Sequence, residues 1–277
     1  MPVVDVHVHL APQRLAAAVQ RALGEMYGWQ VPWPTDPDEV VHELRSAGTD
    51  VMVAQPYAHL PGMAASLNDF SVQFARRHPD VLTMATVHPD DENRVALLST
   101  ALDAGAAGLK VHCPVQRTRP DDPRMSSVYA ACEERGIPVL MHAGHGPDSV
   151  TPHTGARAFA ALLRRHPSLR ICVAHLGMPE SRAFFDMAAD HPNVFLDLAG
   201  VPGGLIDALP LDDMHRLSDR ILWGSDYPNT MAAPRPAYDR MRSLGVSGDL
   251  LDSVMWRNAP RFLGRDVLPL PGTDTAC

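Results

Sequence analysis

The chain has 277 residues, of which 45% are hydrophobic and 20% are charged, and its formal net charge at pH 7 is −8. This length suits one large domain, and this balance of apolar and charged residues excludes a disordered chain. The negative net charge disfavours nucleic acid as a partner.

Two features of the sequence bear on its location. No apolar run approaches the roughly 18–20 residues that a membrane span needs, and the first apolar run follows no basic leader with a cleavage site. We therefore expect no membrane association and a cytoplasmic location. The four cysteines (Cys113, Cys132, Cys172 and Cys277) show no CxxC spacing, so we expect reduced thiols rather than disulfides or a thiolate zinc site.

Short β-branched runs alternate along the chain with helical stretches rich in Ala, Leu and Arg. The predicted strands cover residues 3–8, 50–55, 81–88, 107–112, 138–142, 170–175, 193–198 and 220–225. The predicted helices cover residues 37–47, 67–77, 93–104, 124–135, 155–165, 179–189 and 204–217, followed by a pair at 237–244 and 249–262.

This alternation predicts an α/β fold, a (β/α)8 TIM barrel with a parallel sheet, in a single domain over residues 1–277. An open doubly wound sheet would need a GxGxxG turn after the first strand, which the sequence lacks.

Helix-to-strand connections are marked by Gly or by a His-Pro pair after the last helical turn. We therefore predict that His78, His166 and His191, which precede these prolines, are exposed loop residues without chemistry. His42 and His215 fall within helical patterns and are predicted to face solvent.

The first predicted strand, within VVDVHVHL at residues 3–10, places two imidazoles two residues apart in an apolar run. Residues i and i+2 of a strand share a face, so His7 and His9 should point the same way, with Asp5 behind them. Burying polar groups without a partner costs about 2–7 kcal/mol each, and a divalent metal would satisfy both rings through neutral nitrogens. Taken alone, HxH leaves a hydrogen-bonded or surface histidine pair equally open.

Polar residues also end several later strands. Lys110 and His112 share a face at the end of the fourth, His142 ends the fifth, His175 the sixth and Asp226 the eighth. The C-terminal strand ends of a barrel form its active-site face, so this set favours a metal site. The alternatives are a helix N-cap for Asp226 and a hydrogen-bonded structural role for His175.

The ordered motifs HxH, GLKVH, HAGHG, AHLG and GSDYP resemble the amidohydrolase superfamily, more narrowly the branch of aminocarboxymuconate-semialdehyde decarboxylase and related small hydrolases. The resemblance covers almost the whole chain, including HPSLRICVAHLG, NVFLDLAG and RNAPRFLG. It implies a TIM barrel with His7, His9, His142 and Asp226 as ligands of one divalent ion. The nitrogen-rich donor set favours zinc. Asp226 would then act as general base, and His175 would polarise a carbonyl or protonate a leaving group.

Lys110 leaves the number of ions open. In the binuclear branch of the superfamily a fourth-strand lysine is carboxylated and bridges two ions, and His142 and His175 would then both be ligands. In the mononuclear branch this lysine would contact an acidic substrate or balance a carboxylate, and one ion is our expectation.

Other residues near the same strand ends are weaker candidates. His112 would contact substrate or make a core hydrogen bond, and His145 would shape the pocket. The remaining weak candidates are His59, His88, Asp197, Arg117 and Arg119, of which the two arginines are predicted to be solvated loop residues.

These residues predict a metal-dependent hydrolase that attacks an amide, lactam, lactone or related carbonyl of a small molecule with metal-bound hydroxide. The alternative is nonoxidative decarboxylation of a small unsaturated or aromatic acid, which the resembling branch carries out on the same ligands. A third hypothesis, a catalytically inactive binding barrel, is disfavoured by the intact ligand set. Because the branch often forms dimers, a homodimer is also open.

Overall fold

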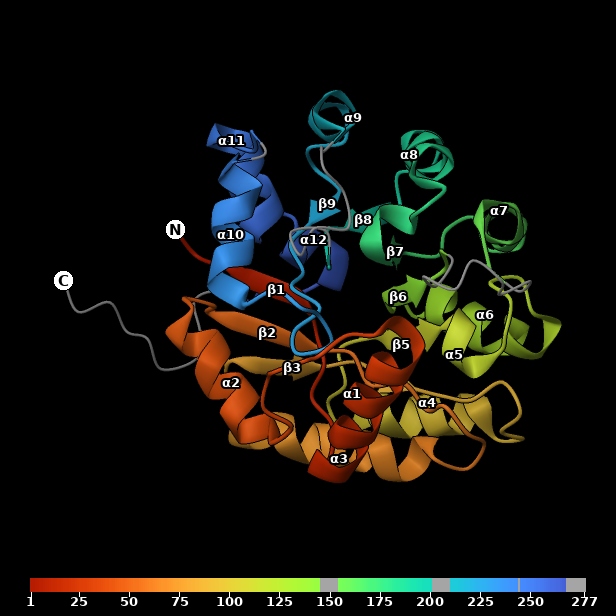
Figure 1. Ribbon diagram of the computed structural model, residues 1–277. Coiled ribbons are helices and arrows are strands. Elements are labelled where there is room, and N and C mark those ends of the chain that lie inside the picture. Colours follow the sequence, from red (N-terminus) through yellow and green to blue (C-terminus); the bar gives the residue numbers. More distant parts are fainter. Residues whose placement is uncertain (145–153, 201–209, 244, 268–277) are drawn as a thin grey trace.

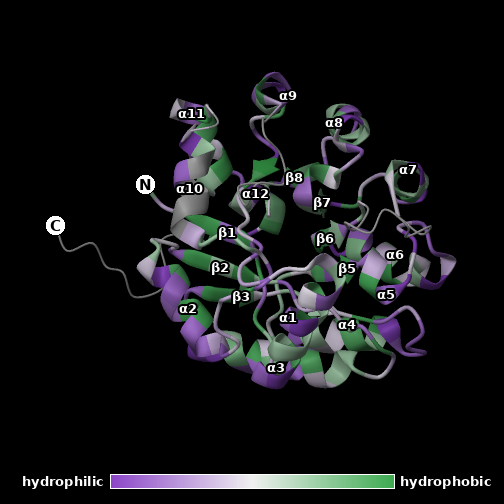
Figure 2. Ribbon diagram, in the orientation of Figure 1, coloured by the Kyte–Doolittle hydropathy of each residue, from purple (hydrophilic) through white to green (hydrophobic). Residues whose placement is uncertain are grey.

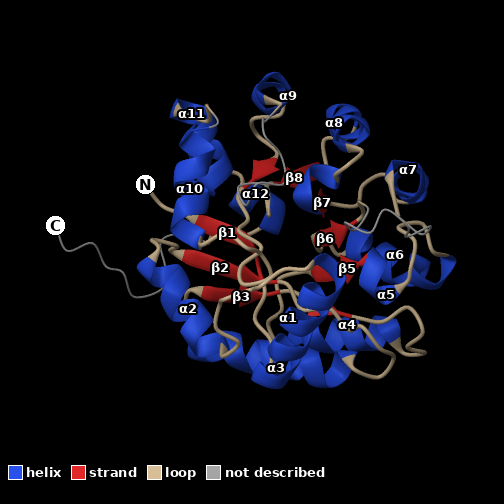
Figure 3. Ribbon diagram, viewed as in Figure 1, coloured by secondary structure: helices blue, strands red, loops and turns tan. Residues whose placement is uncertain are grey.

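The structure is a computed structural model that describes residues 1–144, 154–200, 210–243 and 245–267. Strands occupy its centre and helices surround them (Figure 3). The strands are β1 (Val4–Val8), β2 (Val51–Ala54), β3 (Val81–Thr83), β4 (Ala85–Thr86), β5 (Leu109–His112), β6 (Val139–His142), β7 (Ile171–Val173), β8 (Val194–Asp197) and β9 (Ile221–Leu222).

All pairings between these strands are parallel, in the orders β1-β2-β3 and β4 to β9. Met84 alone separates β3 from β4, and its N–H donates to the Ala54 carbonyl at 2.9 Å, so the two form one interrupted strand. Between β9 and β1, the Val6 N–H donates to the Trp223 carbonyl at 3.0 Å and closes the ring. The predicted (β/α)8 TIM barrel is therefore confirmed.

The helices form a ring outside the strands (Figure 1). The longer ones are α2 (Pro37–Ser46), α3 (Ala64–Arg77), α4 (Arg94–Asp103), α6 (Ser126–Glu134), α7 (Ala156–Arg165), α8 (Ser181–Asp190), α9 (Leu211–Arg216) and α10 (Pro234–Ser243). Short helical segments are α5 (Cys113–Gln116), η1 (Pro123–Met125), η2 (Ala174–Gly177), α11 (Gly248–Asp252), the π-helical η4 (Ser253–Arg257) and α12 (Ala259–Leu263).

Apolar residues gather on the strands and on the helix faces that cover them (Figure 2). Inside the barrel, Val6, Val53, Leu140 and Phe195 belong to one buried cluster, which α12 joins through Phe262. β-branched and other large apolar residues favour strands buried on both faces, because helices cover the outside and side chains fill the interior. The barrel is thus a packed core that carries polar side chains at its mouth.

One long helix, α1 (Gln13–Tyr27), was not predicted from the sequence, nor was the short α5. Helix α1 follows β1 directly and lies in front of the strands rather than in the ring (Figure 1). No side-chain cap marks its start after Pro12, its first turn has no acidic residue, and none of its residues is fully buried. The start signals on which helix prediction depends are therefore missing.

The predicted exposure of the histidines in helices and in His-Pro pairs is confirmed only in part. His42 and His215 are exposed, as predicted, and His78 and His191 are partly exposed. The prediction for His166 was wrong. This side chain is buried and its Nδ1 lies 3.1 Å from Glu133 Oε2, because the connection after α7 folds back onto α6.

Cys113, Cys132 and Cys172 are buried and free, while Cys277 lies outside the described residues. Among the described residues, no helix is both long and apolar enough to cross a membrane.

A matched pair of glycine substitutions tests the packing of η2 against α8. Gly177 and Gly28 both have φ of +69°, but a Cβ on Gly177 would lie 2.1 Å from the Phe184 ring, whereas one on Gly28 meets nothing within 4 Å. Gly28→Ala should lower the free energy of unfolding only by the cost of the left-handed conformation, roughly 1–2 kcal/mol. Gly177→Ala should lower it by about 1–3 kcal/mol more, because the new Cβ overpacks the contact with Phe184. Urea denaturation measures both changes. Equal losses would contradict this packing.

Candidate metal centre at the barrel mouth

His7, from β1, lies at the centre of the site and is almost fully buried. Its Nδ1 lies 2.9 Å from Asp197 Oδ2 at the end of β8. A carboxylate only accepts, so Nδ1 carries the proton and Nε2 presents its lone pair to the mouth. Burial lowers the pKa of His7 well below its usual value, helped by the charge of Lys110. His7 is therefore a neutral imidazole with a free donor atom, as a metal ligand must be.

Asp226, after β9, faces two imidazoles at once. Its Oδ1 lies 2.9 Å from His9 Nε2 and 3.6 Å from His7 Nε2. Although burial by itself raises the pKa of Asp226, the hydrogen bond with His9 and the surrounding imidazoles bring it below the usual range. The carboxylate is thus ionised at neutral pH.

The ring of His9 is held between a backbone carbonyl and a carboxylate. His9 Nδ1 lies 3.2 Å from the Gln55 carbonyl, and His9 Nε2 lies 2.9 Å from Asp226 Oδ1. His9 is thereby directed at the same carboxylate as His7.

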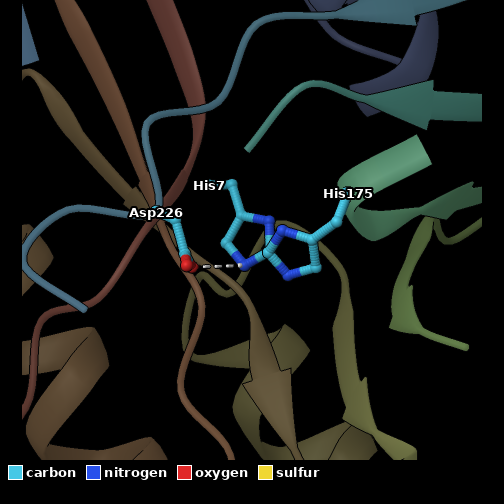
Figure 4. A group of neighbouring side chains, drawn as sticks. All are labelled: His7, His175 and Asp226. Carbon is cyan, nitrogen blue, oxygen red and sulfur yellow. Dashed lines mark ion pairs between the residues drawn. The ribbon is translucent and has the colours of Figure 1, made fainter. Parts of the chain in front are cut away.

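The side chains of His7, His175 and Asp226 converge on one point (Figure 4). One ligand atom from each lies within 4.8 Å of the others. Imidazole nitrogens bind zinc at about 2.0–2.1 Å and carboxylate oxygens at about 2.0–2.2 Å, so a small contraction would place all three on one ion. Two imidazoles and an ionised carboxylate fit a divalent transition-metal ion.

The other predicted ligands surround this group. The ring of His142 has its centroid 4.7 Å from that of His175, and the ring of His9 lies 5.2 Å from that of His7. The ligand set His7, His9, His142 and Asp226 stays a prediction, to which the geometry adds His175. The Nδ1 of His175 lies 2.8 Å from the Ala199 carbonyl, which leaves its Nε2 as the free donor atom.

Asp197 is the residue that sequence reasoning undervalued. Besides holding His7, its Oδ1 accepts the backbone N–H groups of His175 at 2.8 Å and Ala199 at 3.0 Å. One buried carboxylate therefore orients two imidazoles, in the manner of the carboxylate partners of metal-bound histidines. The available signal was its place as the last residue of β8, in LDLAG.

Backbone conformation sets the direction of two site residues. His175 and Asp226 have φ of 56° and 64°, in the left-handed region that non-glycine residues rarely adopt. Such strain persists where the surroundings fix it, and here the Asp226 N–H donates to the His7 carbonyl at 2.8 Å. Gly224 permits the close approach of this segment, because a Cβ there would lie 2.8 Å from the Cβ of His7.

Lys110, in β5, is the only lysine of the chain and is fully buried. Its Nζ lies 3.0 Å from His7 Nε2, the same nitrogen that would bind an ion. Among the described residues no carboxylate lies within ion-pair distance of it, and burial lowers the pKa of Lys110 to about 8. The ammonium group and a metal ion therefore compete for His7 Nε2.

A row of neighbouring rings continues from the centre. His112 stacks on His142 with centroids 4.3 Å apart, and Tyr57 lies 4.9 Å from His112. Burial lowers the pKa of both imidazoles well below the usual value, so both are neutral. His112 Nδ1 accepts the Val115 N–H at 3.4 Å, the local hydrogen bond that the sequence left open. His145 lies outside the described residues, and its role stays a prediction.

The weaker candidates lie in different surroundings. His59 lines a recess beside His9, whereas His88 Nδ1 accepts the Asp90 N–H at 3.1 Å within its own loop. Arg119 pairs with Asp121 at 2.7 Å, and both Arg117 and Arg119 are exposed, as predicted.

Comparisons with known proteins place the chain in a family. A family model described as amidohydrolase matches residues 4–265. No curated protein matches the chain. At the 16–20% identities of the structures described next, the likeness is one of fold.

Three solved structures share the barrel over 95% of this chain. An uncharacterised TIM-barrel protein from Bordetella bronchiseptica has a TM-score of 0.72 at 20% identity, with 99% of its own chain covered. A 2,6-dihydroxybenzoate decarboxylase in complex with 2,6-dihydroxybenzoate has a TM-score of 0.71 at 18% identity, also with 99% covered. A 5-carboxyvanillate decarboxylase from Novosphingobium aromaticivorans, in complex with manganese and a nitrobenzoic acid, has a TM-score of 0.66 at 16% identity, with 96% covered.

Replacing the lysine tests how it acts on the metal centre. Lys110→Met removes both a positive charge and the competitor for His7 Nε2, so we expect divalent-ion affinity to rise by about tenfold or more. Isothermal titration calorimetry of metal-stripped protein measures this affinity and the stoichiometry, which should stay at one ion per chain. Arg117→Met, which removes an exposed cation from the same rim, is the control. Loss of ion binding in Lys110→Met would instead indicate a carboxylated, bridging lysine.

Proposed function

The chain belongs to the amidohydrolase family, and on that premise we propose that it is a metal-dependent nonoxidative decarboxylase of a small unsaturated or aromatic carboxylic acid. The observation that carries the proposal is Lys110, a buried cation next to neutral imidazoles, with no described carboxylate within ion-pair distance. Such a group is complementary to a substrate carboxylate. The decarboxylases among the similar structures support this choice over hydrolysis.

The predicted ligands His7, His9, His142 and Asp226, together with His175, would hold the ion. A divalent ion bound there would act as a Lewis acid on a substrate oxygen. The donor set favours zinc, whereas one similar structure contains manganese. The identity of the ion therefore belongs to the proposal.

The residues of the chain itself would position the acid and supply the proton that replaces its carboxyl group. Lys110 would hold the carboxylate in the barrel mouth. The bond between the carboxyl carbon and its neighbour breaks, CO2 leaves, and the neighbouring carbon keeps the electron pair and takes a proton. Asp226, which is partly exposed at the mouth, would take this proton from solvent and pass it to the carbon.

The hydrolase reaction predicted from the sequence uses the same groups in the opposite direction. There Asp226 would remove a proton from water, and oxygen from water would enter the product. The fate of solvent oxygen and hydrogen therefore distinguishes the two reactions.

The experiment uses purified protein loaded with Zn²⁺ or Mn²⁺ and a panel of hydroxybenzoic and unsaturated acids in D2O. We expect CO2 release and one deuteron at the carbon that lost the carboxyl group, detected by mass spectrometry. Asp226→Asn should lower the rate by about 100-fold or more, whereas His42→Ala, a change at an exposed histidine, should leave it unchanged. Incorporation of ¹⁸O from labelled water into amide or lactone products, without CO2 release from the acids, would contradict the proposal.

A further inference from the structure

A recess that is open to solvent lies beside the candidate metal centre. Its walls include His9, Tyr57 and Pro228 from the barrel mouth and Leu15, Ala16 and Val19 from α1. His9 connects the recess to the site, because its Nε2 contacts Asp226.

The lining of the recess contains no Asp, Glu, Lys or Arg among the described residues. Its polar groups are two imidazoles, two amides and the Tyr57 hydroxyl, and the rest of the wall is apolar. A carboxylate placed there would lose its hydration without gaining a cationic partner. The charge that suits a carboxylate lies at Lys110, which is not part of this wall.

The wall formed by α1 is held in place by hydrogen bonds. The N–H groups of Leu15 and Ala16 donate to the Pro12 carbonyl at 2.7 and 3.0 Å, which fixes the start of the helix. Further along, Gln20 donates to the Trp33 carbonyl at 3.1 Å, and the Trp33 indole donates to the Thr230 carbonyl at 2.6 Å. The helix is thereby tied to the segment that follows Asp226.

The apolar face of α1 is only partly buried by the described residues. Leu15 and Val19 are four residues apart and lie on one face of the helix, and neither is fully buried. An apolar face left partly open, beside a reactive centre, suits a ligand that completes its burial.

We propose that this recess receives the part of the substrate remote from the reacting carboxylate. It would select monocarboxylic acids with an uncharged apolar ring or chain against dicarboxylic acids of the same shape. This inference rests on the proposed function for the identity of the reacting group, but the selectivity itself is a property of binding.

Equilibrium binding tests this selectivity without turnover. The probes are benzoate and benzene-1,3-dicarboxylate, titrated into metal-loaded protein by isothermal titration calorimetry. We expect the wild-type protein to bind benzoate about tenfold or more tightly than the dicarboxylate. Val19→Arg should bring a cation into the recess and reduce this ratio about tenfold or more, and Leu15→Arg provides a second variant with the same expectation.

Gln13→Arg is the matched control. It adds the same charge to the same helix at an exposed position that does not share the face of Leu15 and Val19, and it should keep the wild-type ratio. An unchanged ratio in folded Val19→Arg and Leu15→Arg, or no binding of either probe to the wild type, would overturn the inference. Selective binding of benzoate without CO2 release from any tested acid would support the inference about the recess and contradict the proposed decarboxylation.

Discussion

The contact between His7 Nδ1 and Asp197 Oδ2, at 2.9 Å inside the barrel, is the interaction on which the site depends. It joins the first strand to the eighth, fixes the tautomer of His7 and aims Nε2 into the mouth. The same carboxylate holds the backbone of His175. Removing the Asp197 carboxylate would leave the buried His7 imidazole and the strained backbone at His175 without their hydrogen-bond partner. Both candidate ligands would then lose their orientation.

The barrel brings these groups together because parallel strands expose all their C-terminal ends on one face. Asp226 reaches His7 and His9 from the last strand only because β9 closes on β1 and Gly224 leaves room beside His7. Lys110 approaches from β5, on the far side of the same ring. The result is a group of imidazoles between the Asp226 carboxylate and the Lys110 side chain. That arrangement can bind an ion and an acidic substrate next to each other.

The strand ends could be predicted from the sequence because each couples two local signals, an apolar run and a single polar residue that stops it. This placed His142, His175 and Asp226 on one face. The Asp197 contact joins residues 190 positions apart, which no local pattern encodes. The left-handed backbone of His175 and Asp226 is likewise imposed by tertiary hydrogen bonds, and α1 lacks the caps that would have marked it. The hydrophobic periodicity of the sequence therefore could not predict the recess that α1 lines.

Anomalous diffraction from crystals of the purified protein, recorded at the absorption edges of zinc and manganese, tests the metal centre most directly. The account predicts one peak per chain, within about 2.5 Å of His7 Nε2 and of an Asp226 carboxylate oxygen. Absence of a peak there after loading with either ion, or a peak confined to exposed histidines such as His42 and His215, would contradict it.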